Sequence, residues 1–334
     1  MNVRTASSLS EPLNPIAGGC SARLRVRRFV YPLLGLLLLF GSTEIGLRVI
    51  LGLGHPILYE IDPAFGYFTQ PLQHTRRLFA RTATNGLGMR SPEFALDKPK
   101  GTLRLMFLGD STTYGTTEVD QDDIFVERVR KSLSTALHRP VQDFNAAANA
   151  WAISNEGGFL FSRGTYRSDY VLLVLNSGDL DQPFSRFSDI SAGYTAYPRS
   201  AIGELLTRLV VLGKQHSHND AGTTVEYNPG IEQANLRELS SMAQFLKAQG
   251  SGFLLVFVPF RREIAQGARS SVPHALTSWA GSEGIDLIDL TASVSSYQTE
   301  AITLRDRTHY NSLGNRLLAD SLEGYLAAKF HQHP

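Results

Sequence analysis

Residues 103–115 read LRLMFLGDSTTYG, an apolar run that stops at a glycine and continues into small polar residues. The run from Leu103 to Leu108 predicts a β-strand, because short apolar runs bounded by turn residues are typical of strands that are covered on both faces. Gly109 lets the chain bend sharply, and Ser111 would lie at the positive end of the following helix. Taken alone, such a turn is more often an ordinary helix cap than a functional site.

The chain beyond this turn alternates between short apolar runs and longer amphipathic stretches. Strands are expected at residues 103–108, 141–144, 171–175, 253–258 and 285–290. Helices are expected at residues 124–137, 154–166, 200–212, 231–249, 272–283 and 312–330. This order predicts an α/β fold, a three-layer α/β/α sandwich around a mostly five-stranded parallel sheet. Ligands bind such sheets at the carboxyl ends of the strands, so the segments that follow the strands are the candidate site.

The composition is that of a globular protein with a substantial core. Of the 334 residues, 43% are hydrophobic and 19% are charged. A net charge of +1 gives no reason to expect nucleic acid, which needs a concentrated basic face. Cys20 is the single cysteine, which excludes an internal disulfide framework.

The N-terminal part predicts a membrane anchor. Residues 1–28 are expected to be a disordered basic tail, rich in Ser, Pro and Gly at first and in arginine at its end. Residues 29–53 are apolar apart from Glu44 and Arg48, which can pair at i and i+4 on one helix face. This stretch exceeds the roughly 20 residues that a spanning helix needs. Because basic residues favour the cytoplasmic side, we expect a single-pass signal anchor in a bacterial inner membrane, with the remainder of the chain outside the cytoplasm.

Other interpretations of this stretch stay open. A cleaved signal peptide also fits, since the apolar run is followed by small residues at positions 41–43. A buried amphipathic helix is a further alternative. Cys20 follows small residues, as in a lipoprotein processing site, but its apolar segment comes after the cysteine rather than before it, which favours a free thiol. Residues 54–100 are expected to connect the anchor to a domain spanning residues 101–330.

A second polar cluster lies before the last expected helix, in the sequence DRTHYN at residues 306–311. Serine catalysis needs an imidazole that accepts the hydroxyl proton and a carboxylate that orients the imidazole. Asp306 and His309 are three residues apart, so in a tight turn the carboxylate can reach one ring nitrogen while the other faces Ser111. The two clusters are expected at the same edge of the sheet, in the chain order Ser, Asp, His.

Together these blocks resemble the SGNH, or GDSL-type, hydrolase family, and in particular its membrane-anchored bacterial members. The first block is matched by Leu108-Gly109-Asp110-Ser111, and the last by Asp306 and His309 with the Tyr and Asn that follow. The segment NGLGMR at residues 85–90 resembles one that precedes the first strand in anchored members. The resemblance covers roughly residues 85–326 and implies a flavodoxin-like SGNH fold and a catalytic triad of Ser111, Asp306 and His309.

The middle blocks of the family match less well. They normally supply a glycine N–H and an asparagine amide that bind the oxyanion. Ala150 occupies the glycine position, where a backbone N–H does not depend on the side chain. An ungapped match places Gly178 at the asparagine position, so Asn176 is the candidate amide. The oxyanion donors implied by the resemblance are therefore Ala150 and Asn176.

The resemblance implies a serine esterase that deacetylates an envelope or extracellular carbohydrate, without a metal or other cofactor. An O-acetyltransferase on the same scaffold is an alternative, and so is a non-catalytic carbohydrate-binding or assembly protein. The substrate could also be a small ester. The segment 181–227 could form a wall or lid for it, since this segment follows the third strand.

Three other patterns are better explained without a site. His216 and His218 resemble a metal loop but lack a third ligand at a suitable spacing, which favours a surface linker. The glycines of the 86–88 segment do not follow an expected strand, which disfavours a dinucleotide site. The nucleophile elbow of α/β-hydrolases needs glycine where this chain has Thr113.

Overall fold

The computed structural model describes residues 19–190, 193–220, 228–265, 270–306 and 308–332. Within these ranges, side chains are described except for those of residues 19–26, 212–220, 261–262 and 332. The chain divides into two compact units, residues 1–46 and residues 47–334.

The first unit consists of most of helix α1 (Gly19–Leu51). Its segment Arg27–Leu51 is long and apolar enough to cross a membrane, by length and composition. Pro32 lies inside the helix, where it removes one backbone N–H donor. The helix contains residues 29–51 of the expected span at 29–53. It begins earlier, at Gly19, so residues 19–28, which were expected to be disordered, are helical; Ala, Leu and Arg in this part favour a helix. The role of the helix as an anchor stays a prediction.

The second unit is built around five parallel strands in the order β6-β5-β7-β8-β9. These strands are β5 (Leu103–Gly109), β6 (Val141–Ala147), β7 (Tyr170–Leu175), β8 (Gly252–Phe257) and β9 (Asp286–Asp289). In chain order this is 2-1-3-4-5, the order of doubly wound folds of the flavodoxin type. The predicted fold class is therefore confirmed.

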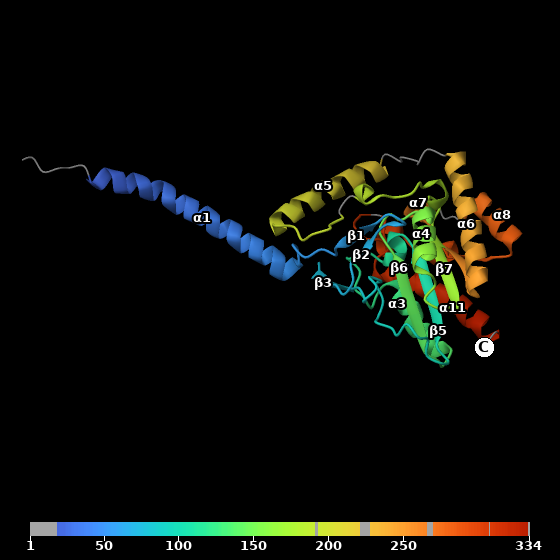
Figure 1. Ribbon diagram of the computed structural model, residues 1–334. Helices are drawn as coiled ribbons and strands as arrows, with labels where there is room; N and C mark the ends of the chain where they lie inside the picture. The colour runs from blue at the N-terminus through green and yellow to red at the C-terminus, as the bar shows by residue number, and fades with distance from the viewer. Residues whose placement is uncertain (1–18, 191–192, 221–227, 266–269, 307, 333–334) are drawn as a thin grey trace, which may run out of the picture. The chain divides into compact units, whose positions relative to one another are not determined.

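Both faces of the sheet are covered, because successive residues of a strand point to opposite faces. In β5, Leu105 and Phe107 join the core on one face, while Met106 and Leu108 join the core on the other. The first core packs against α3 (Phe125–Ala136) and α11 (Ser312–Gln332). The second packs against α4 (Ile153–Arg163), α6 (Pro229–Gln249) and α8 (His274–Glu283). Figure 1 shows these helices beside the strands.

Two hairpins precede the sheet in a region expected only to connect. One pairs β1 (Tyr59–Asp62) with β2 (Gly66–Thr69), and the other pairs β3 (His74–Arg77) with β4 (Ala80–Ala83). Aromatic side chains of the first hairpin pack on the buried Trp151, whose ring centroid lies 5.4 Å from that of Phe68. The hairpins escaped the sequence analysis because each strand has four residues, too few for a hydrophobic period to be evident.

The unit also contains seven further helical elements within the described residues, most of them short. They are α2 (Ser111–Tyr114), the 3₁₀ turns η1 (Asp179–Asp181) and η2 (Phe187–Asp189), α5 (Ala201–Asp220), α7 (Arg261–Ala265), α9 (Thr291–Val294) and α10 (Thr299–Ile302). The expected helix at 200–212 is thus longer, and its continuation contains His216 and His218, which were assigned to a linker. The side chains of these two histidines lie outside the described residues.

Gly109 lies where the sheet leaves little room for a side chain. An added Cβ would lie 2.1 Å from Thr113 Oγ1 and 3.0 Å from Val174 O. Gly109→Ala is therefore expected to lower the free energy of unfolding by about 1–3 kcal/mol, the usual cost of overpacking. Chemical denaturation measures this change.

Gly281→Ala in α8 is the matched control, because a Cβ there meets nothing within 4 Å. It should raise the free energy of unfolding by about 0.5–1 kcal/mol, since alanine suits a helix better than glycine. Equal changes in the two variants would contradict the tight fit at Gly109.

Candidate active site

Ser111 is the first residue of the short helix α2, directly after β5. Asp110 caps this helix: its Oδ1 accepts a hydrogen bond from Thr112 N at 2.7 Å. The cap fixes the turn so that Ser111 lies half-buried at the carboxyl end of β5. The structure thus places Ser111 at the sheet edge predicted from the sequence.

His309 reaches the same edge from the loop before α11. Its Nε2 lies 2.8 Å from Ser111 Oγ, across 198 residues of chain. Its Nδ1 lies 2.6 Å from Asp306 Oδ2. Asp306 Oδ1 also accepts from the His309 backbone N–H at 3.1 Å, so the carboxylate holds both the ring and the turn that carries it. With Nδ1–H donating to Asp306, Nε2 is left to accept the Ser111 proton.

The electrostatics suit a base that is held by its carboxylate. Burial lowers the pKa of His309, but the hydrogen bond and charge of Asp306 outweigh burial, so the net shift is upward. The charges of Asp110 and Glu118 act in the same direction. Burial raises the pKa of Asp306, and the hydrogen bond and charge of His309 reverse this, so its net shift is downward. The pair therefore favours an ionised Asp306 beside an imidazole that readily takes a proton.

The residues after His309 keep its loop in place. Tyr310 is buried, and its hydroxyl donates to Pro259 O at 2.6 Å. Asn311 Oδ1 accepts from the backbone N–H groups of Leu313 and Gly314 at the start of α11. The aromatic and Asn that follow the histidine are thus positioning residues with separate anchors.

Ala150 lies in the turn after β6 with a φ of 59°, in the left-handed region. This conformation costs a non-glycine residue of order 1 kcal/mol, and the turn is held by its neighbours. Trp151 is fully buried, and its Nε1 donates to Tyr67 O at 3.0 Å. Ala148 N donates to Gly109 O at 3.3 Å, which joins this turn to the Ser111 turn.

The backbone N–H groups of Ser111 and Ala150 have no hydrogen-bond acceptor among the described residues. Both turns lie at the carboxyl edge of the sheet, since Gly109 and Ala147 are paired in register. Unpaired N–H groups at such an edge are available to a ligand oxygen. The role of Ala150 as an oxyanion donor remains a prediction.

Asn176 makes several hydrogen bonds in the turn after β7, including one from Asp179 N to its carbonyl at 3.3 Å. Its Nδ2 donates to Asp110 Oδ2 at 3.2 Å, and its Oδ1 accepts from Gly178 N at 2.8 Å. Its backbone N–H donates to Asp179 Oδ2 at 2.7 Å. The side chain therefore supports the Ser111 turn through Asp110. One of its two amide protons is used in this contact, and its predicted oxyanion role stays untested.

The turn fits the absence of a side chain at Gly178. A Cβ there would meet both Asn176 Oδ1 and the Phe260 ring at 3.3 Å. The family asparagine therefore does not fit this position unless its neighbours shift by a few tenths of an ångström.

A group of buried carboxyls lies behind these turns and was missed by the sequence analysis. Asp179 and Glu156 are 2% and 1% exposed, and one oxygen of each has no hydrogen-bond partner among the described residues. Burial raises the pKa of both groups well above its usual range, and repulsion from nearby carboxylates adds to the rise. Because an unpaired buried charge is costly, these carboxyls keep protons that exposed carboxyls lose. The sequence does not reveal this cluster, because Glu156 lies in α4 and Asp179 in η1, which only the fold brings together.

The segment at residues 85–90 holds the chain that follows α2 in place through Arg90. Arg90 is buried, and its guanidinium donates to the carbonyls of Tyr114, Thr116 and Val119. These carbonyls belong to the segment that contains Glu118, whose charge raises the pKa of His309. Burial lowers the pKa of Arg90 to about 10, which leaves it charged at neutral pH.

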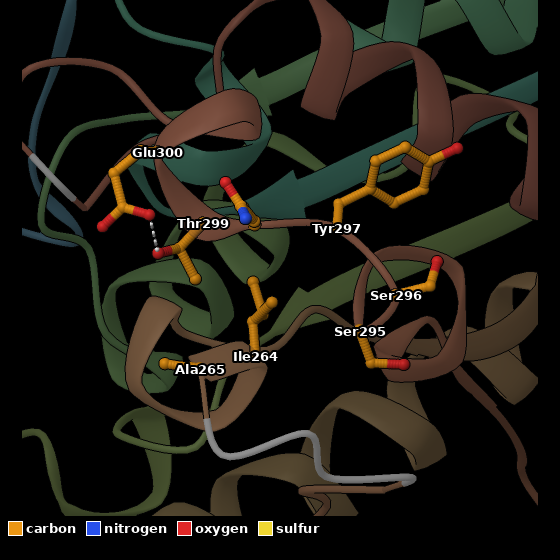
Figure 2. A pocket seen from close by; sticks show the side chains of 8 residues that line it. Ile264, Ala265, Ser295, Ser296, Tyr297, Thr299 and Glu300 are labelled. Carbon is orange, nitrogen blue, oxygen red and sulfur yellow. Dashed lines mark hydrogen bonds between the residues drawn. The ribbon is translucent and has the colours of Figure 1, made fainter.

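Other candidate sites gain no support. Within the ranges that the structure describes, no group of three His, Cys, Asp or Glu side chains could hold a metal ion. A separate open hollow of about 630 Å³ is lined by Ile264, Ala265 and residues 295–300. Figure 2 shows the side chains that line it. Thr299 Oγ1 donates to Glu300 Oε2 at 3.0 Å in its wall, and the three triad side chains do not line it.

Asp306→Asn tests whether the carboxylate of Asp306 orients and stabilises the charged form of His309, because the amide keeps the shape of the side chain and removes its charge. An amide cannot stabilise the imidazolium and favours the wrong tautomer, so ester hydrolysis is expected to fall by roughly 10³–10⁴-fold. The pKa of His309 should also drop, because the hydrogen bond and charge of Asp306 are the largest interactions that oppose burial. His309 must be neutral to act as a base, so the acid limb of kcat/KM, expected above pH 6.5 in the natural chain, should move to lower pH.

Asp320→Asn, at an exposed carboxylate of α11, is the control and should leave the profile unchanged. A pH profile that stays in place in Asp306→Asn would contradict the assigned role.

Glu156→Gln tests the buried carboxyls through stability. The folded chain keeps a proton on Glu156 that the unfolded chain releases near pH 4.5, so the free energy of unfolding should fall as the pH rises from there towards the folded-state pKa. The variant lacks this contribution, and its loss of stability with pH should be shallower in denaturation curves. Glu60→Gln, at an exposed position, is the control. Parallel pH dependences for Glu156→Gln and the natural chain would refute the proton on Glu156.

Comparisons with known proteins give structural matches only. No family model and no curated protein matches the sequence. Among solved structures, TesA is 14% identical with a TM-score of 0.43, over 67% of this chain and 97% of TesA. The psychrotrophic esterase EstA from Pseudoalteromonas sp. is 12% identical with a TM-score of 0.42, over 69% of this chain and 99% of EstA.

A third match is a two-domain esterase, CEX, described as active on acetylated mannans. It is 13% identical with a TM-score of 0.42, over 68% of this chain and 49% of CEX. In its first and last sequence blocks, its strand order and the geometry of Ser111, Asp306 and His309, the chain resembles the SGNH hydrolases.

Proposed function

We propose that the chain is a serine esterase that works by acyl transfer, with Ser111 as the nucleophile, His309 as the base and Asp306 as the group that orients the base. The observation that carries the proposal is the unbroken series of contacts from Asp306 Oδ2 to His309 Nδ1 at 2.6 Å and from His309 Nε2 to Ser111 Oγ at 2.8 Å. Each residue type, atom and order is what nucleophilic catalysis by serine needs.

The chemistry proceeds in two halves. His309 Nε2 takes the Ser111 proton as Oγ attacks the ester carbonyl, and Asp306 stabilises the imidazolium that forms. The imidazolium then protonates the leaving alcohol, which leaves an acyl group on Ser111. Water, activated by the same imidazole, attacks the acyl-enzyme and releases the acid, restoring Ser111.

The oxyanion that forms during attack needs hydrogen-bond donors. The N–H groups of Ser111 and Ala150 are free of protein acceptors among the described residues, and we assign them this role, with Asn176 as the third candidate. Loss of one such donor typically costs about 10²–10³ in rate. The left-handed backbone at Ala150 supports the assignment, because this φ is uncommon for alanine and is held by packing around Trp151.

We further propose that α1 anchors the protein as an uncleaved span in a bacterial inner membrane, with its N-terminus in the cytoplasm and the site outside. The length and hydropathy of residues 27–51 support a span, and the arginines that precede the span support the orientation. The site is therefore exposed to envelope and extracellular material. An acetyl ester on a carbohydrate is the proposed substrate.

Acetate release from acetylated xylan and mannan, and from a chromogenic acetyl ester, tests the activity. The full-length chain should release acetate, and Ser111→Ala should lose activity by roughly 10³-fold or more, since only binding and the oxyanion donors remain. Ser162→Ala, at an exposed serine of α4, is the matched control and should retain activity.

Equal rates for Ser111→Ala and the natural chain would contradict the proposal. Transfer of acetyl groups to an added glycan that exceeds hydrolysis would identify an acetyltransferase with the same nucleophile.

A further inference from the structure

Helix α5 exposes three large apolar side chains on one face. Leu206, Leu209 and Val210 are 59%, 56% and 58% exposed, and at i, i+3 and i+4 they share one face. The opposite face carries Glu204, which is 2% exposed, and the half-buried Arg208. A helix on a water-exposed surface normally has the reverse arrangement, with its apolar face inwards.

The inward polar face is firmly attached. Glu204 Oε2 accepts from Gly54 N at 2.6 Å, and Oε1 forms a buried ion pair with Arg77. Arg208 pairs with Glu118, whose charge acts on His309. These contacts fix the rotation of α5 about its axis, so the exposed apolar face is a consequence of specific pairing rather than of a loosely held helix.

The same contacts attach α5 close to the end of α1. Gly54 follows the last residue of α1, Leu51, by three positions. Leu78 N donates to Leu51 O at 2.9 Å, in the turn between β3 and β4. Arg48, in the last turn of α1, donates to Arg199 O at 3.1 Å, just before α5 begins. The start of α5 is therefore bound to residues at the end of the candidate span and just after it.

Two aromatic side chains belong to the same region. Phe79 is 68% exposed and follows Leu78 in the turn that contacts Leu51. Tyr197 is 53% exposed, and its ring centroid lies 5.4 Å from that of His55, just beyond the end of α1. Tyr is enriched where proteins cross the boundary between lipid and water, because its ring is amphipathic.

We propose that these five side chains form an interfacial surface that docks on the bilayer crossed by α1, in the leaflet from which the second unit emerges. The interfacial surface consists of Phe79, Tyr197, Leu206, Leu209 and Val210. The inference goes beyond the proposed esterase activity and rests on the proposed anchoring by α1.

Lipid is the occupant that the connectivity favours. Where the span ends at Leu51, Leu78 contacts its last residue and Gly54 follows by three positions. Because Glu204 of α5 binds Gly54, α5 would meet lipid at a high effective concentration. A helix with an apolar face lies in such an interface with that face in the acyl boundary.

Depth-dependent quenching in the full-length chain tests this surface. In a Cys20→Ser background, Leu209→Cys is labelled with an environment-sensitive fluorophore and the protein is reconstituted in vesicles of phosphatidylcholine and phosphatidylglycerol. Nitroxide attached near the lipid headgroup should quench this label at least several-fold more than a label at Leu96→Cys. Leu96 is the matched control, because it is 65% exposed and its carbonyl binds Arg104 at the start of β5, the opposite edge of the sheet from Ser111.

The outcomes separate the two levels of the proposal. Retention in the vesicles after an alkaline carbonate wash, with equal quenching at the two labels, would overturn docking and leave the anchor intact. Release by the wash would overturn anchoring and docking together. A label at Leu209→Cys that is shielded without lipid quenching, and only at high protein density, would show that a second copy covers the surface and would also overturn docking.

Discussion

The hydrogen bond between Ser111 Oγ and His309 Nε2 is the contact on which the account of this molecule depends. It joins segments 198 residues apart, and neither side chain could hold the other without the sheet. Parallel strands end at a common edge, so β5 delivers Ser111 to the same edge at which the loop before α11 delivers His309. Asp306 then orients the ring from three residues away, and the buried Tyr310 fixes the loop to Pro259.

Around that contact, several residues adopt conformations or burial that lower the stability of the fold. Ala150 holds a backbone conformation that alanine seldom adopts. Glu156 and Asp179 are buried, and one oxygen of each lacks a hydrogen-bond partner within the part of the chain that the structure describes. Features of this kind concentrate where a structure must place groups accurately, and they are sustained by the packing around them. Here the aromatic packing on Trp151 provides that support. The contact from Asn176 to Asp110 shows how the turn after β7 braces the nucleophile turn.

The sequence predicted what depends on local pattern and on strand ends. Ser111 was predicted from an apolar run that ends in a glycine, and His309 from its spacing to Asp306. The hairpins before the sheet were missed because four-residue strands carry little periodicity. The carboxyl cluster was missed because Glu156 and Asp179 come from separate segments that only the fold brings together. The outward apolar face of α5 could not be predicted, since a helical period does not say which face meets the protein.

Covalent labelling tests whether Ser111 is activated in the folded chain. A fluorophosphonate reacts with serines that have an adjacent base, and mass spectrometry of the digested protein locates the adduct. The account predicts a single adduct on the peptide that contains Ser111, absent after prior unfolding and strongly slowed in His309→Ala. An adduct elsewhere, or an unmodified Ser111 in the folded protein, would contradict it.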